Sequence, residues 1–289
     1  MAANKYDRRS QDVGNIVGLE HVNVRVPDQV TATAFYVMGL GFTRDPYIMV
    51  GVENMWINLG QQQFHLPTGG PNVMRGFVDM VVPDLDALTT RLAAVKDKLA
   101  GTKFSYAAED KYVAVTCPWG NRMRFHAPGE YGELTLGMVA VEFPVAPGHA
   151  EGIARFYQSI MGAPARVTPN GGGAVARVQV GLNQDLVFRE TGAPIPAYDG
   201  YHIAVYITDF SGPHDRLEQR GLITEESNPY QYRFQDIVDP DSGEVLCTIE
   251  HEVRCYTHPM FLRPLINRNP NQRQATYQRG RDAFVPGMA

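Results

Sequence analysis

Apolar and polar residues alternate along the first ordered stretch of the chain, from Gly18 to Asp28. An alternation with period two is typical of a strand that buries one face. The stretch ends at Pro27-Asp28 and leads into a segment of helical character, residues 31–38, which closes at Gly39. The pattern therefore predicts a strand followed directly by a helix.

The same arrangement returns further along the chain. In each copy a marked residue stands seven positions before an aspartate, and these pairs are His21 and Asp28, Phe77 and Asp84, and His202 and Asp209. Fixed spacing of this kind is the sequence signature of a repeated structural unit. The marked residue is a histidine in two of these three copies.

Helical and strand periodicities divide the chain into four units of the form β-α-β-β-β. The units cover residues 16–67, 75–128, 135–190 and 200–253. The expected helices are 31–38, 84–99, 151–160 and 213–220, and the later strands include 47–51, 55–59, 62–66, 112–116, 122–126, 174–180, 185–189 and 244–253. A unit that cannot bury its own sheet face must pair with another. We therefore predict an α+β fold with two curved, open eight-stranded sheets and with helices outside.

Linkers rich in glycine and proline set the expected domain limits. Residues 1–15 form an N-terminal tail, 16–130 a first domain and 135–253 a second domain. The C-terminal tail, 254–289, carries prolines that exclude a helix and lacks the alternation of a strand. We expect it to lie extended across the body, where it covers the binding trough or docks a second subunit; a solvated tail is the alternative.

The amino-acid composition is that of an ordinary globular protein. Of its 289 residues 44% are hydrophobic and 20% charged, and the net charge of −5 gives no basic surface for nucleic acid. No apolar run reaches the roughly 20 residues of a membrane span. The N-terminus lacks the apolar centre of a secretory signal. Three cysteines make an odd number, which argues against a disulfide framework. These features predict a cytoplasmic protein.

Several motifs together resemble the vicinal oxygen chelate superfamily, which includes glyoxalase I, extradiol dioxygenases and bleomycin-resistance proteins. They are the β-α-β-β-β repeat, Phe35-Tyr36 followed by Gly39-Leu-Gly-Phe42, and the turns Pro118-Trp-Gly-Asn121 and Asp239-Pro-Asp241. The resemblance implies a divalent metal inside the curved sheet, on the face called the trough here. It also implies that His21 and His202 are metal ligands from two first strands.

The resemblance further implies a ligand from a last strand, where the sequence is less regular. Glu250 is the first choice, although it lies seven residues past Gly243, so a longer turn or a bulge is needed. Glu252 and His251 compete with it. In the first unit, Gln63 and His65 share one strand face and are expected at the rim as a further ligand, a supporting partner or an acid–base group.

The positions of the histidines bear on how the four units pair. If neighbours pair, each trough receives a single first-strand histidine. If unit one pairs with unit four, one trough collects all candidate ligands, namely His21, His202, Gln63 or His65, and Glu250. The other trough then contains Phe77, Arg124 and Val187 and no metal set. We favour this second arrangement, although the ring-cleaving dioxygenases of the superfamily pair neighbours.

Ligand types give the functional expectation. Two imidazoles and one carboxylate suit Fe(II) or Mn(II) and leave room for a bidentate substrate. We therefore expect a metal-dependent enzyme, with ring cleavage of a catecholic, aromatic small molecule as the first hypothesis. If Gln63 adds a fourth ligand, a glyoxalase-type lyase or isomerase with Zn(II) or Ni(II) follows. A metal-free binding protein is the third alternative, and a homodimer stays open.

Overall fold

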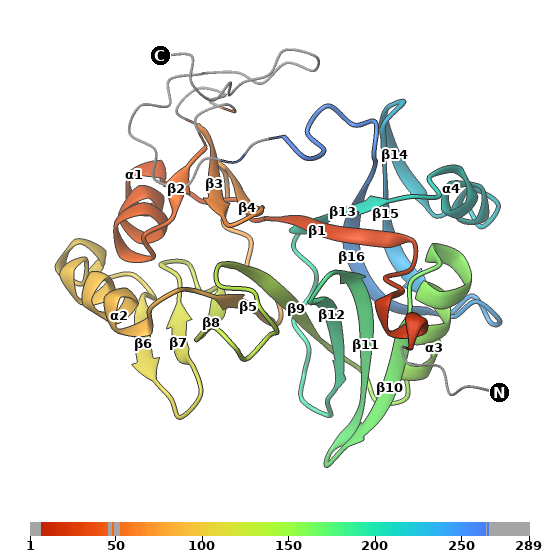
Figure 1. Ribbon diagram of the computed structural model, residues 1–289, viewed down its shortest axis with the longest axis horizontal. Coiled ribbons are helices and arrows are strands. Elements are labelled where there is room, and N and C mark those ends of the chain that lie inside the picture. The colour runs from red at the N-terminus through yellow and green to blue at the C-terminus, as the bar shows by residue number, and fades with distance from the viewer. Residues whose placement is uncertain (1–6, 46–47, 49–52, 264, 266–289) are drawn as a thin grey trace.

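The computed structural model describes residues 7–45, 48, 53–263 and 265, and every structural statement below concerns these residues. Sixteen strands form two eight-stranded sheets (Figure 1). The first sheet contains, in spatial order, β14 (Ile223–Asn228), β15 (Gln231–Val238), β16 (Val245–Cys255), β13 (His202–Ile207), β1 (Ile16–Asn23), β4 (Gln62–Pro67), β3 (Asn54–Leu59) and β2 (Thr43–Arg44). The second contains β10 (Ala165–Asn170), β11 (Gly173–Gly181), β12 (Gln184–Glu190), β9 (Gly137–Val145), β5 (Phe77–Val81), β8 (Arg122–His126), β7 (Val113–Thr116) and β6 (Ser105–Ala108).

The order of strands confirms the predicted pairing of the units. The first sheet joins unit one to unit four, and the second joins unit two to unit three. Within each sheet the two first strands meet antiparallel at the centre, as β1 with β13 and β5 with β9, and each lies parallel to the last strand of its own unit. The division into 16–130 and 135–253 therefore does not correspond to the two sheets.

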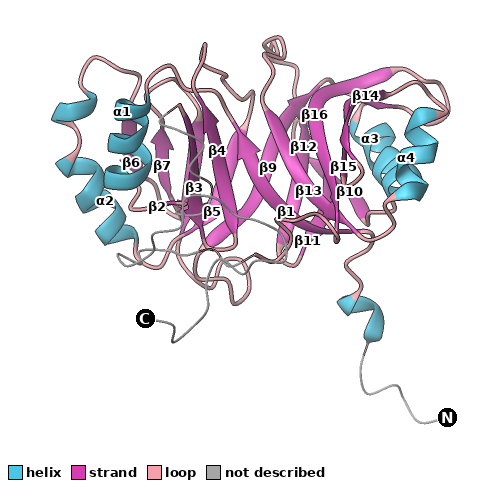
Figure 2. Ribbon diagram, turned by 90° about the horizontal axis from the view of Figure 1, so that it is seen from above, coloured by secondary structure: helices cyan, strands magenta, loops and turns pink. Residues whose placement is uncertain are grey.

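The helices group by neighbours in sequence instead. They are α1 (Gln29–Ala32), continued by a π-helical segment over Thr33–Gly39, α2 (Leu85–Ala94), α3 (Ala150–Phe156), continued by a π-helical segment over Tyr157–Met161, and α4 (Ser211–Glu218). Short 3₁₀ turns cover Arg8–Gln11 and Asp97–Leu99. Figure 2 shows α1 and α2 at one end of the molecule and α3 and α4 at the other, with the strands between them. This is the predicted α+β arrangement of open sheets with helices outside.

The aspartates that mark the repeat start the helices. Asp28 accepts hydrogen bonds from the backbone N–H groups of Val30 and Thr31, at 3.1 and 2.8 Å. Asp84 accepts one from Ala87 at 2.9 Å in the same role at α2. A carboxylate at this position satisfies N–H groups that have no partner inside the helix. The spacing of seven residues therefore runs from the marked residue of the first strand to the aspartate that starts the helix.

Two differences from the predicted strands have simple reasons. The predicted strand 47–51 lies, apart from Ile48, outside the described residues. The outer strands β6, β10 and β14 were not predicted individually, because their residues are mostly exposed and lack apolar alternation. An edge strand packs little apolar surface, so hydrophobic periodicity does not mark it. None of the described helices has the length and apolar character needed to cross a membrane.

Candidate metal centre

Three histidines from three adjacent strands meet on the trough face of the first sheet. His21 lies on β1, His65 on β4 and His202 on β13, and Asn23 of β1 stands opposite both His65 and His202 in the strand registers. One ring nitrogen from each histidine lies within 4.8 Å of the other two. The structure thus brings together the two histidines implied as ligands and one of the two residues expected at the rim.

His21 and His202 face each other through their Nε2 atoms, which are 3.3 Å apart. The other ring nitrogen of each faces a carboxylate. Nδ1 of His21 is 2.8 Å from Glu20, and Nδ1 of His202 is 3.3 Å from Glu250. A carboxylate accepts hydrogen bonds only, so both Nδ1 atoms carry the proton. Both Nε2 lone pairs therefore point toward one another.

Burial lowers the pKa of His21 well below its ordinary value, so the Nε2 atom of His21 does not readily take a second proton. A divalent cation fits the distance: two nitrogens each about 2.1 Å from one ion lie about 3.0 Å apart at a right angle and about 3.4 Å apart at a tetrahedral angle. Carboxylates on the far nitrogens are the usual support of metal-binding histidines. The residues present therefore fit a metal.

The side chain of His65 is fixed in place by its neighbours. Its ring stacks on Trp56 at a centroid distance of 3.9 Å, and its two nitrogens contact the side chains of Asn23 and Asn54, both at 2.6 Å. Burial, together with the neighbouring histidines, lowers the pKa of His65 to about 2. The imidazole therefore stays neutral at physiological pH, and both of its nitrogens have hydrogen-bond partners in this structure.

The two glutamates of β16 take different places. Glu250 lies against Nδ1 of His202, on the side of the ring away from His21, and also accepts from Arg233 at 2.7 Å. Glu252 lies beside the ring nitrogen that faces His21, with Oε2 3.6 Å from Nε2 of His202. The sequence ranked Glu250 above Glu252 as the third ligand; in this structure Glu252, which is also paired with Arg233 and Arg254, is the one beside the ring nitrogen that faces His21. His251, the third competitor, points to the opposite face and bonds Tyr157 at 2.7 Å.

Two arginines not expected from the sequence, the partly buried Arg233 and the buried Arg254, balance these carboxylates. Arg233 contacts Glu250 and Glu252, and Arg254 contacts Glu252 and Glu20. Burial opposes the charge on Glu252, but Arg254 and the neighbouring histidines hold its pKa down to about 2. Three carboxylates thus face two guanidinium groups, which leaves an excess of one negative charge beside the imidazoles. Such a balance favours a bound cation.

Gln63 lies on the trough face but is occupied elsewhere. Its Nε2 donates to Asp45 at 2.8 Å and to Asn58 at 2.6 Å, and its Oε1 accepts from Arg263 at 3.0 Å. All atoms of the amide that could serve a metal or a substrate are therefore in one buried network. The expected role of Gln63 as a fourth ligand or acid–base group has no support in this geometry.

The chain beyond β16 crosses toward unit one. Tyr206 of β13 packs its ring on Phe261 at 4.9 Å and near His258 at 6.3 Å. Arg263 then reaches Asp45, 2.8 Å away, and both side chains are almost fully buried. Residues 256–262 form consecutive turns that contact the body and not the extended segment that was predicted; residues 264 and 266–289 lie outside the described part.

The second sheet repeats the geometry of the first without its chemistry. The strand registers place Phe77 where the first sheet has His202, Ala140 for His21, Val187 for His65 and Arg124 for Glu252. Arg124 binds Asp79 through two hydrogen bonds of 2.7 and 2.6 Å. An arginine has no lone pair for a cation. The second trough is thus filled by ion pairs between its own side chains.

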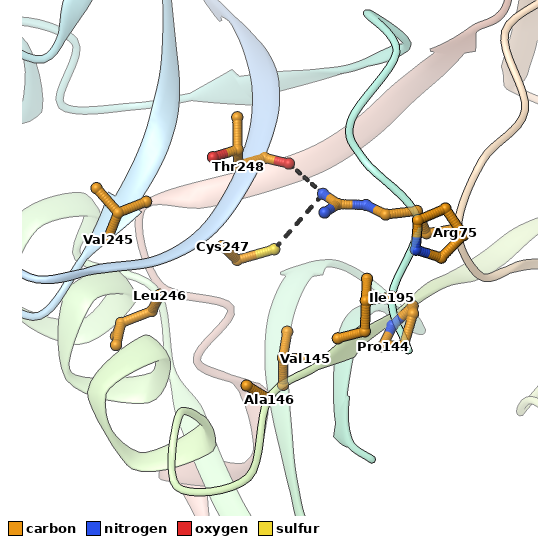
Figure 3. A pocket seen from close by; sticks show the side chains of 10 residues that line it. Arg75, Pro144, Val145, Ala146, Ile195, Val245, Leu246, Cys247 and Thr248 are labelled. Carbon is orange, nitrogen blue, oxygen red and sulfur yellow. Dashed lines mark hydrogen bonds between the residues drawn. The ribbon is translucent and has the colours of Figure 1, made fainter. Parts of the chain in front are cut away.

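Two cavities lie away from the histidines. One of ≈ 270 Å³ is bordered by Arg75, whose guanidinium group points to the carbonyl of Thr248 and the thiol of Cys247 (Figure 3). Another of ≈ 360 Å³ lies between the segment after α1 and the start of α2. None of the three histidines lines either cavity. Both remain separate from the candidate metal centre.

Solved structures provide the comparison. Glyoxalase I from Zea mays has 16% sequence identity over 87% of this chain and 96% of its own, with a TM-score of 0.62. A protein from Bacillus subtilis subsp. subtilis str. 168, named as a presumptive dioxygenase, has 16% identity over 86% of this chain and 87% of its own, with a TM-score of 0.55. The chain has the vicinal oxygen chelate fold. At such identities the likeness extends to the fold alone. No protein-family profile and no curated protein matches the sequence.

The vicinal oxygen chelate fold explains why the histidines meet. Pairing of first strands at the sheet centre places β1 beside β13, and the parallel last strands β4 and β16 flank them. Residues two apart on these four strands share the trough face. Trp56, stacked on His65, and Glu20, Arg233 and Arg254 complete the centre; the places of the last three could not be predicted, because they depend on strand registers.

Proposed function

We propose that this protein is a metal-dependent enzyme that binds a small molecule through two adjacent oxygen atoms, and that it cleaves the ring of a catecholic substrate. The observation that carries the proposal is the pair of Nε2 atoms 3.3 Å apart, with each far nitrogen on a carboxylate. His21, His202 and Glu252 would hold the ion. When bound, the metal supplies a Lewis acid that lowers the pKa of a substrate hydroxyl group.

The ligand types support ring cleavage over the other hypotheses. Two histidines and a carboxylate on one side of an ion suit Fe(II), and also Mn(II). The glyoxalase-type alternative needed Gln63 as a fourth ligand, and Gln63 is bound to Asp45, Asn58 and Arg263. Unit pairing does not favour ring cleavage, because one–four pairing differs from the neighbour pairing of those dioxygenases. Support therefore rests on the ligands.

The protein's own residues have distinct tasks in this proposal. Glu250 keeps Nδ1 of His202 protonated and directs Nε2 into the centre. Trp56, stacked on His65, closes one side of the site. Arg233 and Arg254 keep Glu252 ionised, since a carboxylate must be deprotonated to bind a cation. The three free, buried cysteines suit a reducing compartment such as the cytoplasm.

A second candidate has its own observation. His21, His65 and His202 form a three-nitrogen cluster within 4.8 Å. Three histidines with an open fourth position are a familiar catalytic site for Zn(II). In that case the protein would act as a lyase or isomerase on a substrate that passes through an enediolate.

Metal content and ligand variants test both candidates. Protein purified without chelator, and apoprotein reconstituted with Fe(II), Mn(II), Zn(II) or Ni(II), should contain one ion per chain, and His21→Ala or His202→Ala should abolish this. Loss of metal in Glu252→Ala with retention in His65→Ala supports the first proposal, and the reverse supports the second. Activity is then measured as oxygen consumption with catechols. If no metal binds after reconstitution, the enzyme proposals fail and a metal-free binding protein is favoured.

A further inference from the structure

We infer that Glu20 is a positioning residue for this metal centre, placed there by a β-bulge that the second sheet holds in shape. The inference rests on the proposed function. It concerns the residue immediately before His21 in sequence, which an ordinary strand would direct to the opposite face. In the structure, however, Oε2 of Glu20 lies 2.8 Å from Nδ1 of His21, on the same face.

The bulge is visible in the register of β1 with β13. Leu19 pairs with Val205 and His21 with Ala204, so Glu20 is an extra residue without a partner in the ladder. A bulge of this kind redirects a side chain and is common beside active sites. Here it puts a carboxylate and an imidazole from consecutive residues side by side. Without it, Glu20 would point among the apolar residues beneath the helices.

Glu20 is held from three directions once it is in the trough. Besides His21 it accepts hydrogen bonds from Tyr206 at 2.9 Å and from Arg254 at 2.5 Å, and its side chain is almost fully buried. These contacts leave the carboxylate little freedom to turn away from His21. The proton of His21 is therefore fixed on Nδ1, and Nε2 is kept free for the cation.

A glutamine of the second sheet secures the bulge from outside. Gln184 of β12 accepts from the backbone N–H of Leu19 at 3.0 Å and donates to the carbonyl of Leu19 at 3.2 Å. It also donates to the carbonyl of Met138 at 3.0 Å. Leu19 lies outside the ladder of β1 with β4, which covers only His21 to Asn23, and buried backbone groups outside a ladder need other partners. Gln184 supplies them to the residue next to Glu20.

The second sheet contains the same device without the carboxylate. In the register of β5 with β9, Asp79 pairs with Ala140 and Met80 with Met138, so Val139 is the extra residue. The backbone N–H of Met138 donates to Gln62 of the first sheet at 3.0 Å. Thus each sheet holds the other's bulge through a glutamine. A bulge thus occurs in both sheets, whereas the carboxylate occurs only on the bulge beside the histidines.

Zinc affinity separates the positioning role from a structural one. Zn²⁺ is the probe, because a site built for another first-row ion generally binds it well, and its affinity is measured by competition with a chromophoric chelator. We expect Glu20→Ala and Glu20→Gln to bind Zn²⁺ roughly 10–100-fold more weakly than wild type. Gln184→Met should weaken binding as well. Gln62→Met, the matched control, should lose thermal stability but bind Zn²⁺ like wild type.

Histidine tautomers give a second readout that a purely structural role would not change. In metal-free protein the ¹⁵N shifts of His21 should report the Nδ1–H form, and Glu20→Ala should shift it toward the Nε2–H form. Glu20→Gln, which keeps the side-chain size, covers the case in which the alanine variant does not fold. If wild type and both Glu20 variants bind Zn²⁺ equally, the inference is refuted and the metal proposal stands. If wild type itself binds no Zn²⁺, the proposed function fails first.

Discussion

The contact between Arg263 and Asp45 joins the tail to unit one and can be broken by a single substitution. Their side chains are 1% and 0% exposed and lie 2.8 Å apart. Arg263→Met keeps most of the apolar volume and removes the charge. Asp45 then keeps its bonds from Gln63 and from the backbone of Ile48 but loses the buried guanidinium group of Arg263. A buried carboxylate that loses its cation is strongly destabilised.

The magnitude follows from the burial. Removing one partner of a buried ion pair typically costs about 3–5 kcal/mol. Unfolding of a chain of 289 residues has an entropy of about 0.6 kcal/mol/K, at about 2.1 cal/mol/K per residue. The melting temperature of Arg263→Met should therefore fall by about 5–8 °C. Because Asp45→Asn removes the second charge, the double variant should lose less than the two single variants added together, with a coupling of about 1–3 kcal/mol.

Urea unfolding of the four proteins, followed by tryptophan fluorescence, measures this cycle. Both tryptophans, Trp56 and Trp119, belong to described parts of the fold, so one probe reports both halves. A loss below about 1 kcal/mol in Arg263→Met would refute the reasoning, and so would strict additivity in the double variant. Either result would mean that the tail does not hold Asp45 in solution and that the solvated alternative for this segment is correct.

Three further outcomes are expected. Burial lowers the pKa of His251 to about 4 from 6.5, so between these pH values the unfolded chain binds a proton that the folded chain does not. The free energy of unfolding should therefore fall by about 3 kcal/mol as pH drops from 6.5 to 4. Urea unfolding of chelator-treated His251→Gln should lack this one-proton dependence on pH, and equal pH dependence in wild type and variant would contradict the prediction. Arg124→Met should be less stable than wild type by about 3 kcal/mol, because Asp79 loses the guanidinium group of Arg124. It should nevertheless bind Zn²⁺ like wild type, and weaker Zn²⁺ binding would count against the independence of the two troughs. Gly60→Ala, at a φ of +61° with a carbonyl oxygen 2.2 Å from the new Cβ, should lower the free energy of unfolding by more than about 2 kcal/mol. Gly101→Ala, at a φ of +79° in open space, should lower it by about 1 kcal/mol. Equal losses of stability in thermal melts of the two variants would refute the close contact at Gly60.

The repeat and the pairing of its units could be predicted from sequence because both depend on periodic features. His21 and His202 occupy equal places in their units, and only one pairing brings them together. The third ligand could not be predicted in the same way. A distance of seven residues from Gly243 to Glu250 does not say which of two glutamates, two residues apart on one face, reaches the ion. That choice depends on the register of β16 with β13.

Glu20 shows most clearly where alternation fails. Period two assigns His21 and Asn23 to one face and Glu20, with Val22 and Val24, to the other. A bulge reverses that assignment for a single residue, and it arises from pairing with a strand far away in sequence. The sequence match of Gln63 with Arg124 failed for a related reason. The ladders pair Gln63 with His21 but Arg122 with Phe77, so Arg124, two residues further on, takes the position of Glu252.

Pairing of the first unit with the last also has a consequence for how the chain is made. His21 and His202 are 181 residues apart in sequence. While a ribosome synthesises units two and three, β1 has no partner on the side that β13 will occupy. The second sheet, whose central strands come from consecutive units, can close first, as low sequence separation favours. Gln184 would then be in place to receive β1. Assembly from the middle outward would leave the metal centre among the last parts of the protein to form.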